Sequence, residues 1–317
     1  MPLVRPHSYW LDTAPAPDRG DRPLPAQADA VVVGGGIAGI TVAYLLARAG
    51  RVVVLLEAGR LGGGVSGHMT AKVSAQHALI YDELTRSKGK MRAAEYGASQ
   101  LAAIGRIERV SQALGIDCEF GRRDSLVYAS DPRRRDAMAA EAAGAEQAGL
   151  PASFVENPGY PAEAGWGVRF ERQAQFHPRK WLLGLADRIE AAGGTVVERT
   201  RVTGVREGDP CAVVTERGDI RARDVVIATH YPILDRGLYC ARLEPIRDLV
   251  VAGPVDAAQA PPGMYLEADT HRSLRSAPLP DDRQLLIAGA STIVSAIRWM
   301  SRHATENSPT GRATRED

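Results

Sequence analysis

The chain has 317 residues, 24% charged residues and a formal net charge of +1, an ordinary composition for a globular protein. This length suits two joined domains, and a charge near zero gives no electrostatic basis for binding nucleic acid or an anionic membrane. We therefore expect a small-molecule partner, no nucleic acid and no membrane span. The sequence has no run of about 20 apolar residues, and its first residues lack the apolar core of a signal peptide, so we expect a cytoplasmic protein.

The first half of the chain predicts a βαβ unit behind a lead-in. Residues 1–27 contain proline, aspartate and arginine without periodicity, so we expect an extended lead-in that Tyr9 and Trp10 attach to the body. Apolar runs bounded by glycine predict a strand at 29–33, a helix at 37–49 and a strand at 51–56. Apolar residues that recur every three or four positions predict a helical region from 82 to about 115.

The rest of the chain alternates between predicted strands and helices. Paired strands are expected at 117–130, a helix at 137–149, strands at 152–156 and 166–174, and a helix at 178–192 with proline in its first turn. Strands at 195–198 and 201–205, a hairpin across 217–219 and a buried strand at 225–229 follow. Strand candidates at 243–255, 264–268, 273–277 and 284–289 indicate a second sheet. A short helix to residue 303 and a disordered tail at 304–317 are expected last.

These elements predict an α/β protein with a Rossmann-type, mostly parallel sheet and a second, mixed-sheet α+β substrate domain. The cofactor domain is expected to be discontinuous, formed by residues 28–117, 175–238 and 284–303. The substrate domain then comprises residues 118–174 and 239–283. Cys118, Cys211 and Cys240 show no paired spacing, so we expect reduced structural thiols and no metal site.

A dinucleotide fingerprint, G-x-G-x-x-G, lies between the first predicted strand and helix. Gly34 permits the tight turn, Gly36 lets the backbone approach a pyrophosphate, and Gly39 allows close packing of helix on strand. The helix N-terminus, with Ile37 and Ala38 in its first turn, then presents free N–H groups to the phosphate charge. A glycine-rich turn without a ligand is the alternative interpretation, and the position between strand and helix favours the binding site.

Glu57 ends the second predicted strand of the unit. Its carboxylate can accept both hydroxyls of an adenosine ribose, and it disfavours a 2′-phosphate by like-charge repulsion. NAD and FAD both use this arrangement. The segment 58–71, which begins at Ala58, is small and rich in glycine, so it can follow a long cofactor and offer backbone donors and hydroxyls. A nicotinamide domain normally continues at once into another helix and strand, so the segment favours FAD.

The run DAVVVGGGIAGITVAYLLARAGRVVVLLEAGRLGGGVSGHMTAKVSAQH resembles the N-terminal signature of FAD-dependent oxidoreductases of the D-amino-acid oxidase (DAO) type. The resemblance continues through FHP, GGTVVERTRVTGV, ARDVVIATHYP and RSLRSAPLPDDRQLLIAG, over about residues 28–290. It is closest to a bacterial branch whose members often carry a C-terminal Rieske domain. The resemblance implies that Val202 contacts adenine through its backbone and that Ala228 and Thr229 lie beside the cofactor.

The same resemblance places Ser66, His68, Met69 and Thr70 near the ribityl chain and the isoalloxazine. Related proteins attach flavin covalently to a histidine in a comparable glycine-started stretch, so His68 is a candidate for covalent attachment, with a noncovalent contact as the alternative. The resemblance also puts Arg275 on the substrate side of the flavin, where its guanidinium could hold a carboxylate. A structural arginine is the alternative.

Two further expectations concern the end of the chain and the reaction. Family members continue after the strand at 285–289 with a second glycine-rich segment that faces the flavin, whereas this sequence reads ASTIVSAIRWM and has no Rieske cysteine and histidine pairs. We therefore expect a truncated or frame-shifted product that retains binding of the ADP half. No acid–base pair is evident. His77, Tyr265 and His230 are additional candidates for the substrate side.

The sequence thus predicts an FAD-dependent oxidoreductase that oxidises a C–N bond of an amine or amino acid by hydride transfer to flavin. The electron acceptor is open between oxygen and a partner protein. One alternative is a truncated, flavin-binding remnant without turnover, which a turnover measurement distinguishes. The other is an NAD-dependent dehydrogenase, which an absorption spectrum distinguishes.

Overall fold

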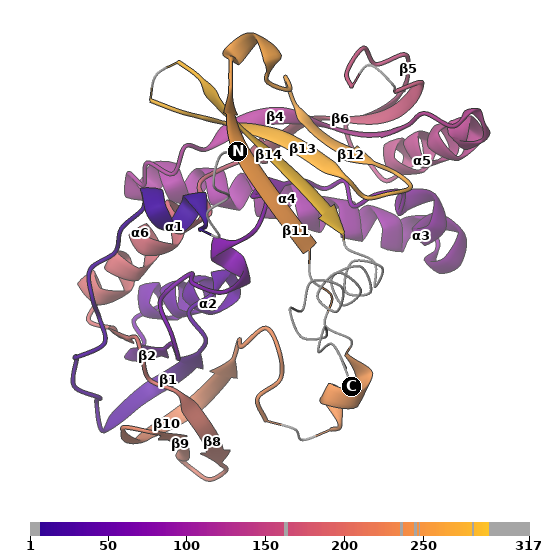
Figure 1. The fold of residues 1–317 in the computed structure, drawn as a ribbon. Helices are drawn as coiled ribbons and strands as arrows, with labels where there is room; N and C mark the ends of the chain where they lie inside the picture. Colours follow the sequence, from indigo (N-terminus) through magenta and orange to yellow (C-terminus); the bar gives the residue numbers. More distant parts are fainter. Residues whose placement is uncertain are drawn as a thin grey trace, which may run out of the picture.

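The computed structural model describes residues 7–161, 164–234, 237–243, 246, 248–280 and 282–291. One sheet of six strands and one of eight organise these residues, with helices packed against both (Figure 1). The mixed α/β fold class predicted from the sequence is confirmed.

The six-stranded sheet has the order β7-β2-β1-β10-β9-β8. Four neighbouring strands, β7, β2, β1 and β10, run parallel, and β9 and β8 are antiparallel to their neighbours. Helices α2 (Ile37–Arg48) and α6 (Pro178–Ala191) supply the apolar core on one face of this sheet. The strands are β1 (Gln27–Val33), β2 (Val53–Leu56), β7 (Thr195–Val197), β8 (Val202–Arg206), β9 (Cys211–Thr215) and β10 (Gly218–Ile227).

The eight-stranded sheet has the order β11-β14-β13-β12-β4-β6-β3, and β5 pairs with β6 beside this path. All its pairs are antiparallel except β12 with β4. The strands are β3 (Lys72–Val73), β4 (Gly121–Ala129), β5 (Ala152–Glu156), β6 (Trp166–Gln175), β11 (Asp248–Val255), β12 (Met264–Glu267), β13 (Ser273–Pro278) and β14 (Gln284–Ser291).

The eight-stranded sheet curls around the segment that precedes β3. Strands β3 and β12 are three places apart, which in a flat sheet means a separation of roughly 14 Å. Nevertheless the Nζ of Lys72 lies 3.4 Å from the carbonyl oxygen of Tyr265 on β12. Arg275 on β13 likewise reaches the carbonyl oxygen of Ala71, at 2.8 Å. The curl therefore encloses residues that directly follow the glycine-rich part of the chain.

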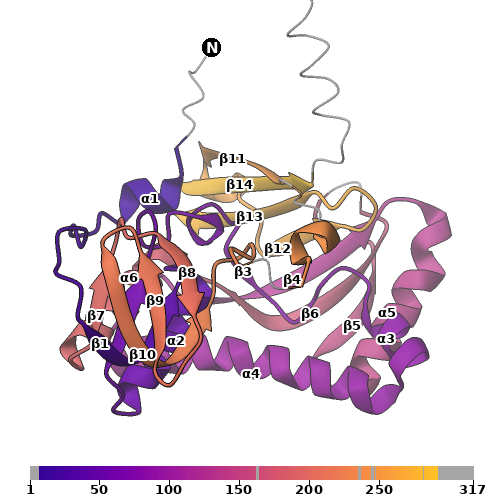
Figure 2. The ribbon, with the colours of Figure 1, turned by 90° about the horizontal axis from the view of Figure 1, so that it is seen from below.

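Three helices pack on one face of the eight-stranded sheet. They are α3 (Tyr81–Lys88), α4 (Lys90–Leu114) and α5 (Arg135–Gln147). Gly89, at φ 86°, divides the helical region predicted at 82–115 into α3 and α4. Ala93 and Leu101 of α4 pack in the core with α5, whereas Ile107 and Leu114 pack against the core of the six-stranded sheet. Helix α4 thus spans both halves of the molecule (Figure 2).

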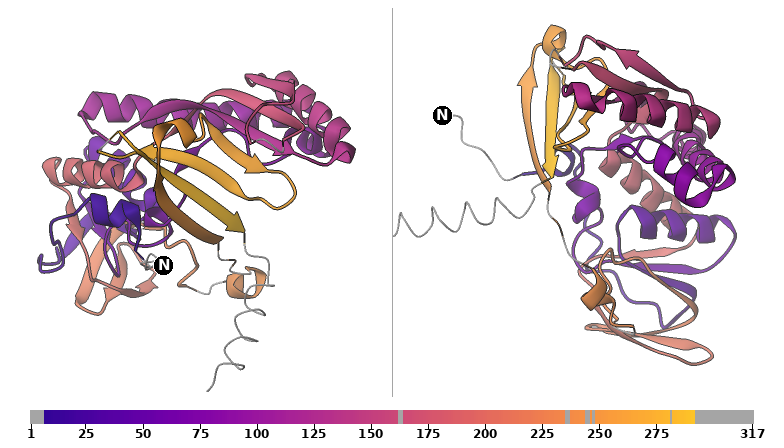
Figure 3. Two further views of the ribbon diagram at one scale, coloured as in Figure 1. Left: turned by 45° about the horizontal axis from the view of Figure 1, so that its top comes forward. Right: turned by 90° about the vertical axis from the view of Figure 1, so that its right-hand side faces the viewer.

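The lead-in is not extended throughout, as the sequence predicted, because α1 (Tyr9–Thr13) forms a helical turn within it. The carbonyl of Ser8 accepts the N–H groups of Leu11 and Asp12, both at 3.0 Å. Trp10 is only 4% exposed, and burying so large a side chain favours the turn that directs it inward. Figure 3 shows α1 where the two sheets meet. The shorter 3₁₀ turns are η1 (Val65–Gly67), η2 (Pro132–Arg134), η3 (Tyr239–Arg242) and η4 (Ala257–Gln259).

The late strands match the predicted positions with shifted ends. The strand predicted at 243–255 is described from Asp248 to Val255, as β11. Strand β14, which the sequence assigned to the cofactor domain, pairs with β13 and β11 in the eight-stranded sheet. The division into domains stays a prediction. The expected helix to residue 303 and the tail at 304–317 lie outside the described residues. Within the described part of the chain, no helix has the length and apolar character needed to cross a membrane.

Candidate cofactor site

Four chain segments meet at one edge of the six-stranded sheet. Because β1, β2, β7 and β10 run parallel, their carboxyl ends lie at the same edge. The segments that leave this edge are 34–36, 57–71, 198–201 and 228–229. Ligands of open α/β sheets bind outside the carboxyl ends of the strands, so this edge is the candidate site.

Gly34 and Gly39 are required by the chain's own packing. Gly34 has φ 113°, and a Cβ there would lie 2.4 Å from the carbonyl oxygen of Ala228. A Cβ at Gly39 would lie 1.9 Å from the carbonyl oxygen of Gly34. These two glycines therefore bring β1, α2 and β10 close together, as the fingerprint predicts for the turn and for helix packing.

Gly36 has no such internal requirement. Its φ of −87° and ψ of −174° suit any residue, and a Cβ there would have only the Oγ of Ser66 within 4 Å, at 3.3 Å. The space in front of Gly36 is therefore open, and it lies at the N-terminus of the 12-residue helix α2. Free N–H groups and the positive end of the helix dipole favour an anion at this place. The open space and the charge both fit the pyrophosphate of a dinucleotide.

Ser66 lies at the same helix N-terminus. Turn η1 brings its hydroxyl to the N–H of Ile37, from which the Oγ accepts a hydrogen bond of 3.0 Å. Ala38 follows in the first turn of α2. The predicted contact of Ser66 with the ribityl chain stays a prediction, and the position of the hydroxyl points to the phosphate end of the cofactor.

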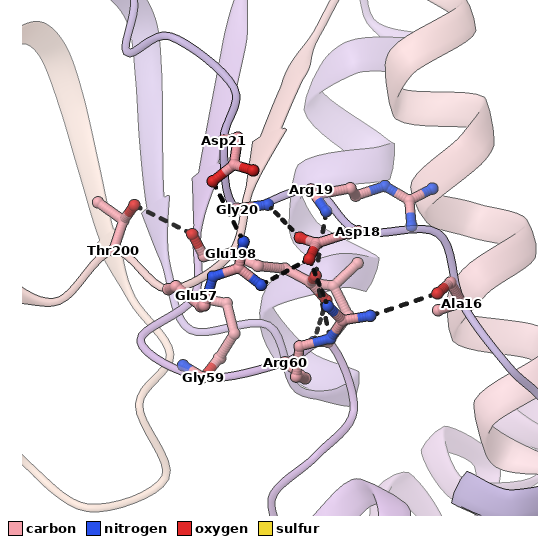
Figure 4. A network of polar contacts seen from close by, with 12 residues as sticks. Ala16, Asp18, Arg19, Gly20, Asp21, Glu57, Gly59, Arg60, Glu198 and Thr200 are labelled. Carbon is pink, nitrogen blue, oxygen red and sulfur yellow. Dashed lines mark hydrogen bonds and ion pairs between the residues drawn. The ribbon is translucent and has the colours of Figure 1, made fainter.

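Glu57 is held in place by backbone groups on both sides (Figure 4). Its Oε2 accepts the N–H of Gly35 at 2.6 Å, and its Oε1 accepts the N–H of Gly59 at 2.7 Å, across Ala58. Its own carbonyl accepts the N–H of Thr200 at 2.9 Å. Each carboxylate oxygen keeps a further lone pair, so the oriented group can still accept the two hydroxyls of a ribose.

Glu198, which the sequence interpretation missed, ties this edge to the lead-in (Figure 4). The residue is fully buried, and its carboxylate accepts the N–H of Leu61 at 2.8 Å and that of Arg19 at 3.3 Å. The Nε of Arg60 lies 3.2 Å from the same carboxylate. A buried carboxylate must be paired to be tolerated, and here the pairing fixes the loop after Glu57. The available signal was an acid directly after the apolar strand β7.

The other predicted contacts lie along the same edge. Val202 begins β8, is 6% exposed, and follows Thr200 by two residues. The N–H of Ala228 donates to the carbonyl of Val33 at 2.8 Å, and the hydroxyl of Thr229 donates to the carbonyl of Tyr231 at 2.7 Å. A pocket of about 580 Å³ opens beside Ala228 and Thr229. The roles of these residues toward adenine and flavin stay predictions.

Residues 67–71, which we call the clasped segment, are held by side chains from two other elements. Ser8 donates its hydroxyl hydrogen to the carbonyl of Gly67, and the Nε1 of Trp10 donates to the carbonyl of Met69 at 2.8 Å. The third such bond runs from Arg275 to Ala71. Thr70 lies in the same segment, and its methyl carbon would be 3.0 Å from a Cβ at Gly289 of β14. Helix α1 and the curled sheet thus fix the segment that the resemblance places beside the flavin.

Arg275 is buried and contacts both Ala71 and Trp10. It is 2% exposed, its Cζ lies 5.2 Å from the ring centre of Trp10, and its Nε has no partner among the described residues. Burial lowers its pKa to about 10. The bond to Ala71 and the stacking on Trp10 support the structural alternative. Carboxylate binding by Arg275 stays a prediction, which the unpartnered Nε leaves open.

The remaining candidates are not gathered around Arg275. His68 is exposed, and its Nδ1 lies 2.9 Å from the carbonyl oxygen of Gly64, which makes Nε2 the nitrogen with the free lone pair. His77 bonds the hydroxyl of Tyr96 at 2.7 Å. Tyr265 pairs across strands with Leu274, so its side chain lies on the opposite face of the sheet from Arg275. His230 is exposed at φ 64°.

Lys72 is a further residue that the sequence interpretation missed. Its ammonium lies inside the curl, directly after the clasped segment, where it donates a hydrogen bond to the carbonyl of Tyr265 on β12. Burial, and then the charge of Arg275, lower the pKa of Lys72 to about 8. A lysine in a two-residue strand gives no sequence signal of burial, because only the curl of the distant strands encloses it.

The comparisons with known proteins agree with this geometry. Residues 29–316 match the family DAO, described as FAD dependent oxidoreductase. The chain is 32% identical over 301 residues to the putative Rieske 2Fe-2S iron-sulfur protein YhfW of Bacillus subtilis, covering 94% of this chain and 59% of that protein. It is 28% identical over 206 residues to gamma-glutamylputrescine oxidoreductase of Escherichia coli, covering 63% of this chain and 48% of that protein. The structure of L-proline dehydrogenase from P. horikoshii has a TM-score of 0.67 at 18% identity, covering 89% and 77% of the two chains.

The fold and the edge of the six-stranded sheet define a dinucleotide-binding flavoprotein. The chain belongs to the DAO family of FAD-dependent oxidoreductases, and its cofactor is FAD. The comparisons give the NAD-dependent alternative no support. The chain spans about half to three fifths of the length of the two curated relatives.

Proposed function

We propose that this chain oxidises a C–N bond of a small amine or amino acid by transfer of a hydride to FAD. The observation that carries the proposal is the placement of the clasped segment between the dinucleotide edge and the concave side of the curled sheet. The dinucleotide edge supplies the groups that bind the ADP half. The curled sheet supplies two cations, the partly buried Lys72 and the buried Arg275, on the side where the reactive end of an extended cofactor would lie.

When bound, FAD supplies the hydride acceptor, and the protein supplies binding and orientation. The N-terminus of α2 neutralises pyrophosphate charge, and Glu57 accepts the ribose hydroxyls. The bonds from Trp10 and Arg275 to the clasped segment keep its backbone rigid where the ring system must be positioned. Burial around Lys72 lowers its pKa, and the charge of its ammonium would attract a nearby anion.

The substrate class is supported by the names of the relatives. One of them is named for an amine, gamma-glutamylputrescine, and the structural neighbour is named for an amino acid, L-proline. In both classes the carbon bonded to the amine nitrogen carries a hydrogen that can leave as hydride. We further propose a small-molecule substrate and a cytoplasmic location, with oxygen or a partner protein as electron acceptor.

Anaerobic reduction of the FAD-loaded protein by a panel of amines and amino acids tests this function. Bleaching of the visible flavin absorbance by at least one C–N substrate is expected, and reoxidation by air or by an added acceptor protein then identifies the acceptor. Flavin that is bound but reduced only by dithionite contradicts the oxidase function. That outcome supports the second candidate, a flavin-binding protein without turnover.

A further inference from the structure

A second pocket, of about 420 Å³, opens on the eight-stranded sheet where β4, β6 and β12 lie side by side. Its volume lies within the usual range for small-molecule sites. Four arginines line it, Arg122, Arg123, Arg169 and Arg172, together with one carboxylate, that of Asp124. We call this cavity the arginine pocket.

The arginine pocket lies on the face of the sheet that points away from the clasped segment. Leu126 on β4 pairs with Arg169 on β6 and with Tyr265 on β12, so these three side chains share one face. Tyr265 in turn pairs with Leu274 on β13. Arg275 is the next residue after Leu274 and therefore points to the opposite face, where it bonds Ala71. Leu126, Arg169 and Tyr265 thus lie on the opposite face from Arg275, whereas Arg123, beyond a register shift in β4, is close enough for its charge to act on Arg275.

Within the described part of the chain, carboxylates balance only some of the charges in the arginine pocket. Arg122 forms an ion pair with Glu108 of α4. Among the residues that the structure describes, no carboxylate oxygen lies within 4.0 Å of the guanidinium of Arg123, Arg169 or Arg172. The carboxylate of Asp124 accepts the backbone N–H of Arg172, at 3.1 Å, and no guanidinium. Counting only described residues, at least two positive charges in the pocket therefore have no carboxylate counter-charge.

The walls between the arginines are apolar and aromatic. Leu126 and Pro262 line the pocket, and so does Tyr265, whose ring centre lies 4.7 Å from that of Tyr160. Guanidinium groups form paired, planar hydrogen bonds with carboxylates and phosphates, and apolar walls favour an organic body over a bare ion. The chemistry therefore fits a small organic molecule with two or more negative charges.

We propose that the arginine pocket is a binding site for a small organic polyanion, distinct from the FAD and substrate site. The shared chemistry is that of a di- or tricarboxylate or of a phosphate ester. Binding there would cross-link β4, β6 and β12 at the end of the sheet that also carries Tyr265. The proposal does not depend on the oxidase function.

Calorimetric titration of the FAD-loaded protein with citrate, and separately with glucose 6-phosphate, tests the proposal at an ionic strength held constant with sodium chloride. Saturable binding is expected for at least one probe. Saturation by citrate identifies a carboxylate ligand, and saturation by glucose 6-phosphate identifies a phosphate ester. Arg169→Gln and Arg123→Gln should each weaken binding by about tenfold or more, since each removes charged hydrogen bonds. The matched control is Arg86→Gln, an exposed arginine of α3 that pairs with Asp82.

Three results would overturn the proposal. The first is the absence of saturable binding beyond that of chloride. The second is equal affinity in the Arg169→Gln, Arg123→Gln and Arg86→Gln variants when circular dichroism shows all three folded. The third is a change in the visible flavin spectrum that saturates together with the probe and persists in the Arg169→Gln variant, which would place the anion at the flavin instead.

Discussion

At the scale of single residues, the three fingerprint glycines have different physical causes. Steric contact within the protein explains Gly34 and Gly39, and it does not explain Gly36. Gly36→Val should therefore leave the fold intact and nearly abolish FAD binding, because the branched side chain would occupy the open space at the N-terminus of α2. Flavin titration with circular dichroism measures both effects. Gly64→Ala is the control, since a Cβ at Gly64 would meet nothing within 4 Å; equal FAD affinity in both variants would refute the pyrophosphate assignment.

Glu57→Ala is expected to weaken FAD binding while the fold persists. The change removes hydrogen bonds of a charged acceptor, which typically contribute about 1.5–3 kcal/mol, or on the order of ten- to a hundredfold in affinity. Glu57→Gln should lose less, because the amide oxygen can still accept the N–H of Gly35 or of Gly59. An unchanged dissociation constant for FAD in Glu57→Ala would contradict the ribose assignment.

Lys72→Met should raise the stability of the protein near neutral pH. The substitution replaces a partly buried ammonium by an apolar chain of similar length, so the melting temperature should rise by on the order of a few °C. The pKa of Lys72 is lowered to about 8, from 10.5 in the unfolded chain, so the unfolded state binds more protons between these values. The free energy of unfolding of the parent should therefore increase as the pH rises from about 8 to about 10.5. The variant should show no such increase. Identical pH profiles of melting temperature would show that Lys72 is solvated.

The residues that the sequence could predict are those whose role depends on near neighbours. Gly34, Gly36, Gly39 and Glu57 lie within one βαβ unit, so their spacing along the chain fixes their spacing in the fold. Trp10, Glu198 and Lys72 act across 59, 137 and 193 positions of sequence, respectively. No local pattern encodes such contacts.

At the scale of elements, α1 is the least expected contributor to the site. Trp10 bonds the clasped segment, stacks on Arg275 and meets the ring of His177 edge-on at 4.9 Å. The imidazole of His177 accepts the N–H of Lys180 and so caps α6, and its other ring nitrogen lies 2.9 Å from the hydroxyl of Thr13. Helix α1 thereby connects the first turn of α6 to the clasped segment.

Trp10→Phe should therefore alter the bound flavin as well as the protein. The variant keeps an aromatic ring over Arg275 and loses the bond to the carbonyl of Met69, at a cost of about 0.5–1.5 kcal/mol or more if that carbonyl stays buried. We expect several-fold weaker FAD binding and a changed visible circular dichroism spectrum of the flavin. Tyr9→Phe, which removes only an exposed bond to Pro278, is the control. If the two variants give the same flavin spectrum, α1 does not position the cofactor.

The elements also show where local patterns stop being informative. The strands of the βαβ unit were predictable because continuous apolar runs indicate burial on both faces. The sheet to which β14 belongs was not predictable. Its apolar residues indicate a core strand, and they do not indicate which strands lie beside it. Its pairing with β11 and β13 is set by antiparallel connections in the substrate half of the chain.

In the whole molecule, both sheets border the proposed cofactor site. The six-stranded sheet presents an edge that fits the ADP half of FAD, and the eight-stranded sheet curls over the segment that leads from it. Helix α1 joins the two by donating to the clasped segment, and α4 packs on the cores of both. Leu126, Arg169 and Tyr265 of the arginine pocket lie on the face of the second sheet opposite Arg275.

Binding of FAD at the carboxyl edge of the six-stranded sheet is tested by the visible absorption spectrum of the purified protein after incubation with excess FAD and gel filtration. Flavin should co-elute with the protein in an equimolar amount and show the two visible flavin bands. The Gly36→Val variant should elute without flavin. A colourless protein that binds NADH and retains no FAD would show that this edge is not an FAD site.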